Sequence, residues 1–171
     1  MNVFLRGEDE TQFTATPRAQ LAAGQERSSM IALENLSARV GDFALEDITF
    51  TVPQGAYGIV IGPTGAGKTT LVEAIAGLVP TTAGRLRLGG TDLTSAPPER
   101  RRLSLVYQHA YLFPHLTVRE NVGYGSVSSK LTVEMLERFG LGEVAGRDVR
   151  VLSGGERQLV ALARALARRP E

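Results

Sequence analysis

The part of this sequence best suited to chemistry is a glycine-rich segment followed by a lysine and two threonines. Its spacing, G-x-x-x-x-G-K-[ST], is the pattern of a phosphate-binding loop. Glycine lets the backbone adopt conformations that a Cβ would forbid, so successive N–H groups can converge on an anion. A lysine supplies charge for the β- and γ-phosphates, and the hydroxyl after it can ligate Mg²⁺. The predicted nucleotide-binding residues are Gly62, Pro63, Thr64, Gly65, Ala66, Gly67, Lys68, Thr69 and Thr70, with Lys68 in a catalytic role and Thr69 as a Mg²⁺ ligand.

The residues on either side have the periodicity that such a loop requires. The apolar run at residues 57–61 predicts a buried strand, and residues 71–78 have the apolar spacing of a helix. A helix that starts near Gly67 would direct its unpaired N–H groups and its positive end at the phosphates. This strand–turn–helix context favours a nucleotide site over an ordinary turn.

A second candidate site lies at the start of the last predicted helix. Ser153 as N-cap and Glu156 three residues later form a capping box. Gly154 and Gly155 follow the cap directly, and each costs helix stability of about 1 kcal/mol relative to alanine. Glycines at these positions indicate that another group must come close to the backbone. Because the N–H groups at a helix N-terminus attract negative charge, that group is expected to be an anion. The helix then continues over residues 159–169, with Leu159, Leu162, Ala163 and Leu166 on one face.

The remaining pattern predicts the elements that position these sites. Two strands between residues 31 and 52 are joined by a turn at Gly41-Asp42, and a further strand spans residues 84–90 after a loop at 80–84. The arginines at 100–102 read as a solvated surface. Residues 103–107 predict a strand that ends at Gln108, whose neutral amide could contact both Mg²⁺ and an attacking water. Helices are predicted at residues 117–123, where Thr117 and Glu120 fit a capping box, and at residues 131–139.

Composition sets further bounds. The chain has 171 residues, 43% of them hydrophobic, which suffices for one core of ordinary domain size. Its 19 basic and 18 acidic residues nearly balance, so charge gives no argument for a nucleic-acid partner. The absence of cysteine excludes disulfides and thiolate chemistry, and two histidines are too few for a histidine-rich metal site. With no apolar run of membrane-spanning length, a soluble cytoplasmic protein is expected.

Residues 1–29 differ from the rest of the chain. They show neither helical nor strand periodicity, which predicts a disordered leader. Met30 begins the first apolar segment and is a candidate for the natural start of translation.

The phosphate loop, Gln108 and the segment Leu152-Ser153-Gly154-Gly155-Glu156-Arg157-Gln158, in that order, resemble the ATP-binding cassette (ABC) ATPases. The last segment resembles their signature motif. The resemblance implies an α/β fold: a P-loop NTPase core with a small N-terminal antiparallel β region and a trimmed helical subdomain, C-terminally incomplete. It covers residues 30–171, divided into a β region and phosphate-loop core (30–108), a helical subdomain (109–152) and a signature helix (153–169).

The resemblance also implies cofactors and partners. In this family two cassettes work head to tail, and each ATP with its Mg²⁺ lies between the phosphate loop of one subunit and the signature motif of the other. Carried over to this chain, Ser153, Gly154, Gly155 and Glu156 belong to the nucleotide site, and Gln108 is catalytic and contacts Mg²⁺. Residues 108–122 resemble importer cassettes, in which this region receives a transmembrane permease subunit at the inner face of the plasma membrane. The phosphate loop and the turn at 97–100 look most like molybdate- or tungstate-type importers, with spermidine and maltose importers as alternatives.

The sequence departs from the family in three respects. The region between Gln108 and Ser153 is shorter than usual, which is why the helical subdomain is expected to be trimmed. The family has an aromatic residue near position 40 that stacks on adenine; here that residue is Val40, and either Phe43 substitutes for it or no residue does. After the signature helix the family continues into an apolar strand ending in Asp-Glu and then a switch histidine, and the 171 residues stop before that strand. Losing such a water-positioning group costs about 10²- to 10⁴-fold in rate. We therefore expect a fragment that is an ATPase by family but impaired as it stands.

Three other interpretations stay open. A P-loop kinase is disfavoured by the signature-like segment and by Gln108. A soluble cassette protein of DNA repair or translation is disfavoured by the absence of any long heptad run. A non-catalytic module that binds nucleotide or a partner is consistent with the 171 residues as given.

Overall fold

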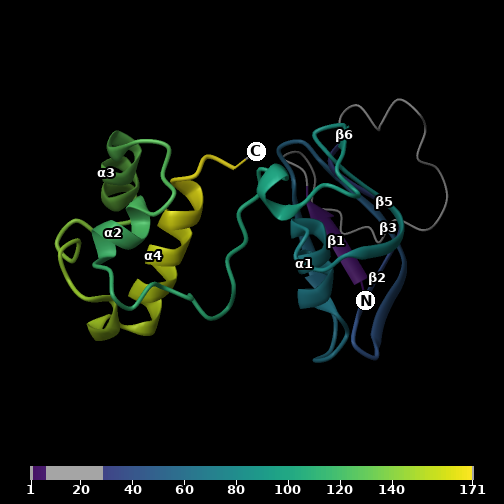
Figure 1. The fold of residues 1–171 in the computed structure, drawn as a ribbon, viewed down its shortest axis with the longest axis horizontal. Helices are drawn as coiled ribbons and strands as arrows, with labels where there is room; N and C mark the ends of the chain where they lie inside the picture. Colours follow the sequence, from purple (N-terminus) through teal and green to yellow (C-terminus); the bar gives the residue numbers. More distant parts are fainter. Residues whose placement is uncertain (1, 7–28, 171) are drawn as a thin grey trace. The chain divides into compact units, whose positions relative to one another are not determined.

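The computed structural model describes residues 2–6 and 29–170, which fall into two compact units, Met1–Arg101 and Arg102–Glu171 (Figure 1). The described strands lie in the first unit, together with one α-helix, and the other α-helices lie in the second. The division between the two units falls after Arg101.

The first unit is built on a four-stranded antiparallel sheet. Strands β2 (Ser29–Val40) and β3 (Phe43–Pro53) form the predicted hairpin, with its turn at Gly41-Asp42. Strand β5 (Thr81–Leu88) pairs with the other edge of β2, and β6 (Thr91–Asp92) completes the order β3-β2-β5-β6. Strand β5 begins three residues before the predicted strand, because Thr81 and Ala83 already pair with β2. The fully buried leucines of this unit, in its core, are Leu33, Leu36, Leu71 and Leu86.

The predicted strand, loop and helix around the lysine are present, but the strand is not buried as predicted: Tyr57, Ile59 and Ile61 are 52%, 44% and 53% exposed. Strand β4 (Tyr57–Ile61) leads through residues 62–67 into helix α1 (Lys68–Ala76). Strand β4 pairs antiparallel with β1 (Asn2–Arg6) in a separate two-stranded sheet. The strand at residues 2–6 differs from the unstructured leader that the sequence predicts; residues 7–28, the rest of that leader, lie outside the described residues.

Arg101 is buried, contrary to the prediction that the arginine run is a solvated surface. It follows the short 3-10 helix η2 (Pro98–Arg100) and is 4% exposed. Its Nη1 donates to the carbonyl oxygens of Ala74 and Ile75, both at 2.8 Å, at the C-terminal end of α1. The Ala74 carbonyl also accepts from the Gly77 N–H at 3.1 Å. Because the last carbonyls carry the negative end of the helix, the guanidinium adds both further hydrogen bonds and the opposite charge. Burial lowers the pKa of the Arg101 guanidinium.

The second unit packs three helices around its own core. They are α2 (Val118–Gly123), α3 (Ser129–Arg138) and α4 (Gly154–Leu166), with the 3-10 turn η3 (Val149–Val151) before α4 (Figure 1). The capping boxes predicted at Thr117 and Ser153 are both confirmed. Across the described residues, no helix combines the length and the apolar character needed to cross a bilayer. The apolar core of the second unit comprises Val118, Val122, Leu131, Met135, Leu136, Leu141, Ala145, Val149, Leu152, Val160, Ala163 and Ala167.

One prediction about the second unit is wrong. Residues 103–107 form no strand, because among the described residues no neighbouring strand pairs with them. Side-chain bonds hold this segment to α4 instead: Ser104 Oγ donates to the Ala165 carbonyl at 2.9 Å. Helix α4 buries a face of small residues, including Val160 and Ala163, against α2 and α3. On the apolar face that the sequence predicts for this helix, Ala163 is buried and the leucines are partly exposed: Leu159 40%, Leu162 38% and Leu166 38%.

Candidate nucleotide-binding site

The loop between β4 and α1 has the backbone geometry of an anion cradle. Gly65 and Gly67 have φ angles of 83° and 84°, in the left-handed region that favours glycine. The Ala66 N–H donates to the Pro63 carbonyl at 3.2 Å and closes a tight turn inside the loop. The first-turn N–H groups of α1, like those of any helix, have no acceptor within the helix. Gly67 is the N-cap, and no side-chain cap bond satisfies these groups either. These are the donors that a phosphate requires.

Lys68 lies folded onto this loop. Its Nζ donates to the carbonyl oxygens of Gly62 at 2.9 Å and Pro63 at 2.7 Å. Bonds from an ammonium group to neutral carbonyls are weaker than bonds to a charged phosphate oxygen. Lys68 is therefore positioned to exchange these partners for the phosphates of a nucleotide held by the same loop.

The residue after the lysine, Thr69, is suited to bind a metal ion that is also coordinated by the phosphates of a nucleotide. Thr69 is exposed on the first turn of α1. The described residues contain no group of three or more histidine or carboxylate side chains that could hold an ion. Mg²⁺ in nucleotide sites is bound by one or two protein oxygens together with phosphates and water, so the Thr69 hydroxyl would suffice on the protein side.

Phe43 is the predicted base-contacting residue, and the structure brings it to the loop. It lies at the start of β3, paired with Val40 across the hairpin end, and is 38% exposed. A Cβ built on Gly67 would meet the ring of Phe43 at 2.6 Å from Cζ and 2.8 Å from Cε1, and Leu45 Cδ2 at 2.7 Å. The ring therefore packs directly against the backbone of the phosphate loop.

The signature-like segment forms the N-terminus of α4. The Ser153 Oγ accepts from the Glu156 N–H at 3.2 Å, while the Glu156 carboxylate accepts from Ser153 Oγ at 2.6 Å and from Ser153 N at 2.8 Å. The hydrogen bonds from the Ser153 hydroxyl and then its N–H lower the pKa of Glu156. The N–H groups of Gly154 and Gly155, in the first turn, have no intrahelical partner. Nothing among the described residues lies within 4 Å of a Cβ built on either glycine. Packing inside the described chain therefore does not require glycine at these two positions.

Gln108 is exposed and belongs to the second unit, where it lines a pocket of about 530 Å³ beside the start of α4. Two side chains of α4 hold this segment. Gln158 Nε2 donates to the Tyr107 carbonyl at 3.2 Å, and Arg164 Nη2 donates to the Tyr111 carbonyl at 3.0 Å. The pocket is lined by Gln108, His109, Ala110, Tyr111, Leu112, Pro114, Val149, Arg150, Gly154, Arg157 and Gln158.

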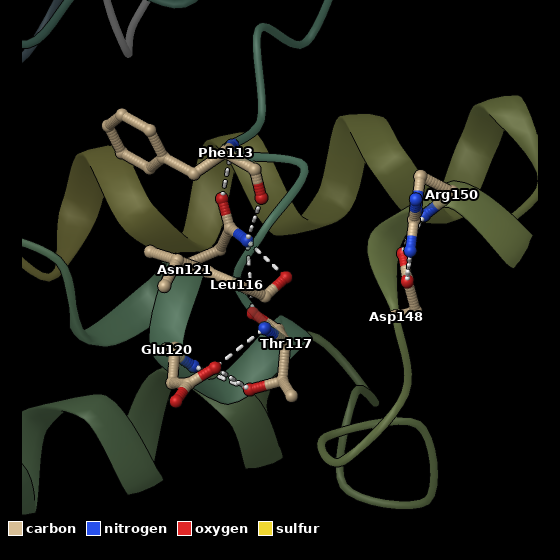
Figure 2. Close-up of polar contacts among 7 residues, drawn as sticks. All are labelled: Phe113, Leu116, Thr117, Glu120, Asn121, Asp148 and Arg150. Carbon is tan, nitrogen blue, oxygen red and sulfur yellow. Dashed lines mark hydrogen bonds and ion pairs between the residues drawn. The ribbon is translucent and has the colours of Figure 1, made fainter.

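Asn121 organises the rest of the predicted permease-binding region, and no sequence prediction singled it out. It is fully buried, and its Oδ1 accepts from the Phe113 N–H at 2.9 Å (Figure 2). Its Nδ2 donates to the carbonyls of Phe113 at 3.1 Å, Leu116 at 3.1 Å and Thr117 at 3.0 Å. Asn121 stands three residues after Val118 and directly before Val122, so it shares their buried face; this spacing was the available signal.

The predicted site residues thus form two groups. In the first unit, Phe43 and residues 62–70 lie together. In the second, Gln108 lies in one pocket with Gly154, at the start of the signature-like helix. Each group is an arrangement of backbone donors and polar side chains suited to phosphate.

Comparison with known proteins identifies the family. The family model described as "ABC transporter" matches residues 45–171. The chain is 41% identical over 150 residues to a molybdate/tungstate import ATP-binding protein of Pyrococcus horikoshii, covering 83% of this chain and 44% of that protein. It is 40% identical over 169 residues to a spermidine/putrescine import ATP-binding protein of Thermobifida fusca, covering 91% of this chain and 44% of that protein.

A solved structure supports the same assignment. A nucleotide-free ATP-binding cassette from an ABC transporter matches with a TM-score of 0.73 and 25% identity, over 83% of this chain and 66% of that one. In the two curated relatives named above, the match covers 44% of their length, so this chain spans less than half of each. The predicted resemblance to ABC ATPases of the importer type is confirmed, and the chain belongs to the ABC transporter family.

Proposed function

We propose that this chain is the ATP-binding part of an ABC import system. The observation that carries the proposal is the loop at residues 62–67, whose two left-handed glycines and folded Lys68 lead into the N-terminus of α1. Residues 62–70 would hold the phosphates of ATP, Thr69 would ligate Mg²⁺, and Phe43 would lie beside the nucleoside. Mg²⁺ would supply charge neutralisation at the β- and γ-phosphates.

The signature-like helix would complete a second copy's site. Gly154 and Gly155 present backbone that nothing in the described chain covers, and the Ser153–Glu156 box keeps the helix start rigid. We propose a head-to-tail dimer in which Ser153, Gly154, Gly155 and Glu156 of one subunit approach the γ-phosphate bound by the other. Gln108 would contact Mg²⁺ and the attacking water.

For the solute, we propose an oxyanion such as molybdate, with a spermidine-type solute as the alternative. The support is the names of the relatives: molybdate/tungstate import in Pyrococcus horikoshii and sulfate/thiosulfate import in Mycolicibacterium paratuberculosis, against spermidine/putrescine import in Thermobifida fusca. Residues 108–122 would dock a transmembrane permease subunit, placing the chain in the cytoplasm at the inner face of the plasma membrane. No role for nucleic acid is proposed.

ATP hydrolysis would drive this transport. The 171 residues contain neither the Asp-Glu pair that follows an apolar strand in the family nor its switch histidine. We propose that the 171-residue polypeptide, assayed alone, binds ATP and turns it over slowly.

The test is ATP binding and turnover by this chain beside Lys68→Ala, with the exposed Lys130→Ala on α3 as a matched control. We expect binding in the chain and in Lys130→Ala, no binding in Lys68→Ala, and turnover near background throughout. Equal ATP affinity in the Lys68→Ala variant would refute the proposed site. Rapid turnover that depends on Lys68 would instead refute the proposed impairment. For the solute, uptake of labelled molybdate, sulfate and spermidine is compared in cells with and without the gene; loss of spermidine uptake alone would exclude the oxyanion.

A further inference from the structure

The contact between Phe43 and Gly67 links two parts of the first unit that are far apart in sequence. Phe43 stands at the end of the β2–β3 hairpin, and Gly67 is the N-cap of α1. The ring atoms Cζ and Cε1 lie where a Gly67 side chain would begin, at 2.6 and 2.8 Å from an ideal Cβ. This is the space that any other residue at position 67 would need.

The contact bears on the backbone that would hold the phosphates. Gly67 has a φ of 84° and precedes the first helical N–H group, so its conformation sets the direction of the donors of Lys68 and Thr69. Gly67 makes no side-chain cap bond that would fix this conformation. The Leu71 N–H donates to the Gly67 carbonyl at 2.9 Å, and the side chains of Phe43 and Leu45 lie against the position of a Gly67 Cβ and restrict the backbone on that side.

The two apolar residues at the hairpin end are not equivalent. Val40 is 48% exposed and pairs with Phe43 in the strand register. Phe43 is 38% exposed, and the covered part of its ring includes the edge on Gly67. An aromatic ring has few rotamers, so it makes a rigid support at low entropy cost.

We propose that Phe43 is a positioning residue for the phosphate loop, acting through Gly67, and that it contributes to triphosphate affinity whether or not a base is present. This inference rests on the proposed function of the loop and deepens it. It differs from the role of a base platform, which would act on the nucleoside alone and leave the polyphosphate unaffected.

Inorganic tripolyphosphate separates the two roles, because it has the phosphates of ATP and no base. Binding of ATP and of tripolyphosphate, each with Mg²⁺, is measured by calorimetry for the chain, Phe43→Ala, Phe43→Leu and Val40→Ala. We expect Phe43→Ala to weaken both ligands by a similar factor, on the order of 10-fold, a loss of about 1.4 kcal/mol. Phe43→Leu should restore much of both affinities, and Val40→Ala should leave tripolyphosphate binding unchanged.

Thermal melts of each variant show whether it is folded at the binding temperature, and the amide resonances of Gly67 and Lys68 report the loop directly. We expect both resonances to shift in ligand-free Phe43→Ala and to stay in place in Val40→Ala. If Phe43→Ala weakened ATP but not tripolyphosphate, Phe43 would be a base platform and the inference would be wrong, while nucleotide binding would stand. If the unchanged chain bound neither ligand, the proposed function itself would fail and the inference with it.

Discussion

Glycine has a different physical role at each of its important positions in this chain. Gly67 is required by its positive φ and by the ring that lies against it. Gly154 and Gly155 have neither constraint: their space is open among the described residues, and they occupy the first turn of an otherwise well-capped helix. Gly154 and Gly155 weaken the helix and relieve no local clash. We therefore explain their presence by a ligand that approaches the helix from outside the chain.

Substitution of Gly155 tests that explanation at the residue scale. We expect Gly155→Ala to raise the stability of the second unit by up to about 1 kcal/mol, because alanine is the better helix former. We also expect loss of ATP-dependent self-association, because the added Cβ occupies the proposed approach of the partner's phosphate. Urea unfolding and sedimentation with and without ATP measure the two effects. Gly146→Ala, at another open glycine, should leave association unchanged; a Gly155→Ala variant that still dimerised with ATP would contradict the proposal.

The Asp148–Arg150 pair gives the second unit an acid-sensitive contact (Figure 2). Hydrogen bonds from the Arg150 side chain, followed by its backbone N–H, lower the pKa of Asp148 from 3.8 to about 2. Because the folded-state pKa is the lower one, the contact stabilises the folded state above the unfolded pKa. That contribution is lost as the pH falls from about 4 through 2.

We therefore expect the urea midpoint of the unchanged chain to fall more steeply between those pH values than that of Asp148→Asn. Arg150→Gln should give an intermediate slope, since it removes the side-chain donor but keeps the backbone N–H that also lowers the pKa of Asp148. Parallel slopes in all three proteins would show that the pair does not contribute to stability.

Among the helices, strands and loops, single buried polar side chains hold loop segments in place by hydrogen bonds to the loop backbone, which has no helix or strand pairing. Arg101 connects the C-terminal end of α1 with the loop that precedes Arg101 in the sequence. Its Nε donates to the Ala96 carbonyl in that loop at 2.8 Å. Asn121 does the same for residues 113–117, whose backbone groups it pairs from inside α2. Both act at chain turns, where each adds side-chain hydrogen bonds to backbone groups at a helix end or in the adjoining loop.

Loss of Asn121 should therefore disrupt a loop as well as a helix. We expect Asn121→Leu to destabilise the second unit by about 2–4 kcal/mol, because it removes four side-chain hydrogen bonds at a buried position, those to the Phe113 N–H and to the carbonyls of Phe113, Leu116 and Thr117. The change is measured by urea unfolding, with the exposed Arg119→Ala on the same helix as control, which should stay within about 0.5 kcal/mol. Asn121→Asp, which keeps the acceptor for Phe113, should be intermediate if its charge is tolerated. A loss below 1 kcal/mol in Asn121→Leu would mean that water replaces the side chain.

At the scale of the whole molecule, the chain contains two cores that draw on different segments. Leu33, Leu71 and Leu86 are buried in the first unit, and the apolar cluster of α2, α3 and α4 lies wholly in the second. The proposed phosphate site lies in the first unit and the signature-like helix in the second. Ligand binding by a monomer should therefore stabilise one unit selectively.

Hydrogen exchange with ATP and Mg²⁺ measures this selectivity. At a ligand concentration 100 times the dissociation constant, we expect α1 and β2–β5 to gain about 2.7 kcal/mol of protection against global opening of the first unit. Helices α2 and α3 should exchange as before when the protein concentration is kept too low for dimers. Lys68→Ala should show no gain anywhere. Equal protection in both units would instead mean that they unfold as one.

The sequence by itself determined the local features of this protein. The phosphate-loop pattern, the β2–β3 turn and the two capping boxes depend on residues within a few positions of one another, and all formed as predicted. The family followed from the same short motifs. Their geometry depends on backbone preferences that act locally, so spacing along the chain is sufficient information.

Only the tertiary structure decided which surfaces meet. It buried the alanine and valine face of α4 rather than its leucines, turned Arg101 inward, left residues 103–107 without a ladder, and placed Phe43 on Gly67. Each outcome depends on a partner 24 or more positions away, or on the absence of one among the described residues. Hydrophobicity and charge show what a side chain can do, but the packing of distant segments decides which of its possible partners it finds.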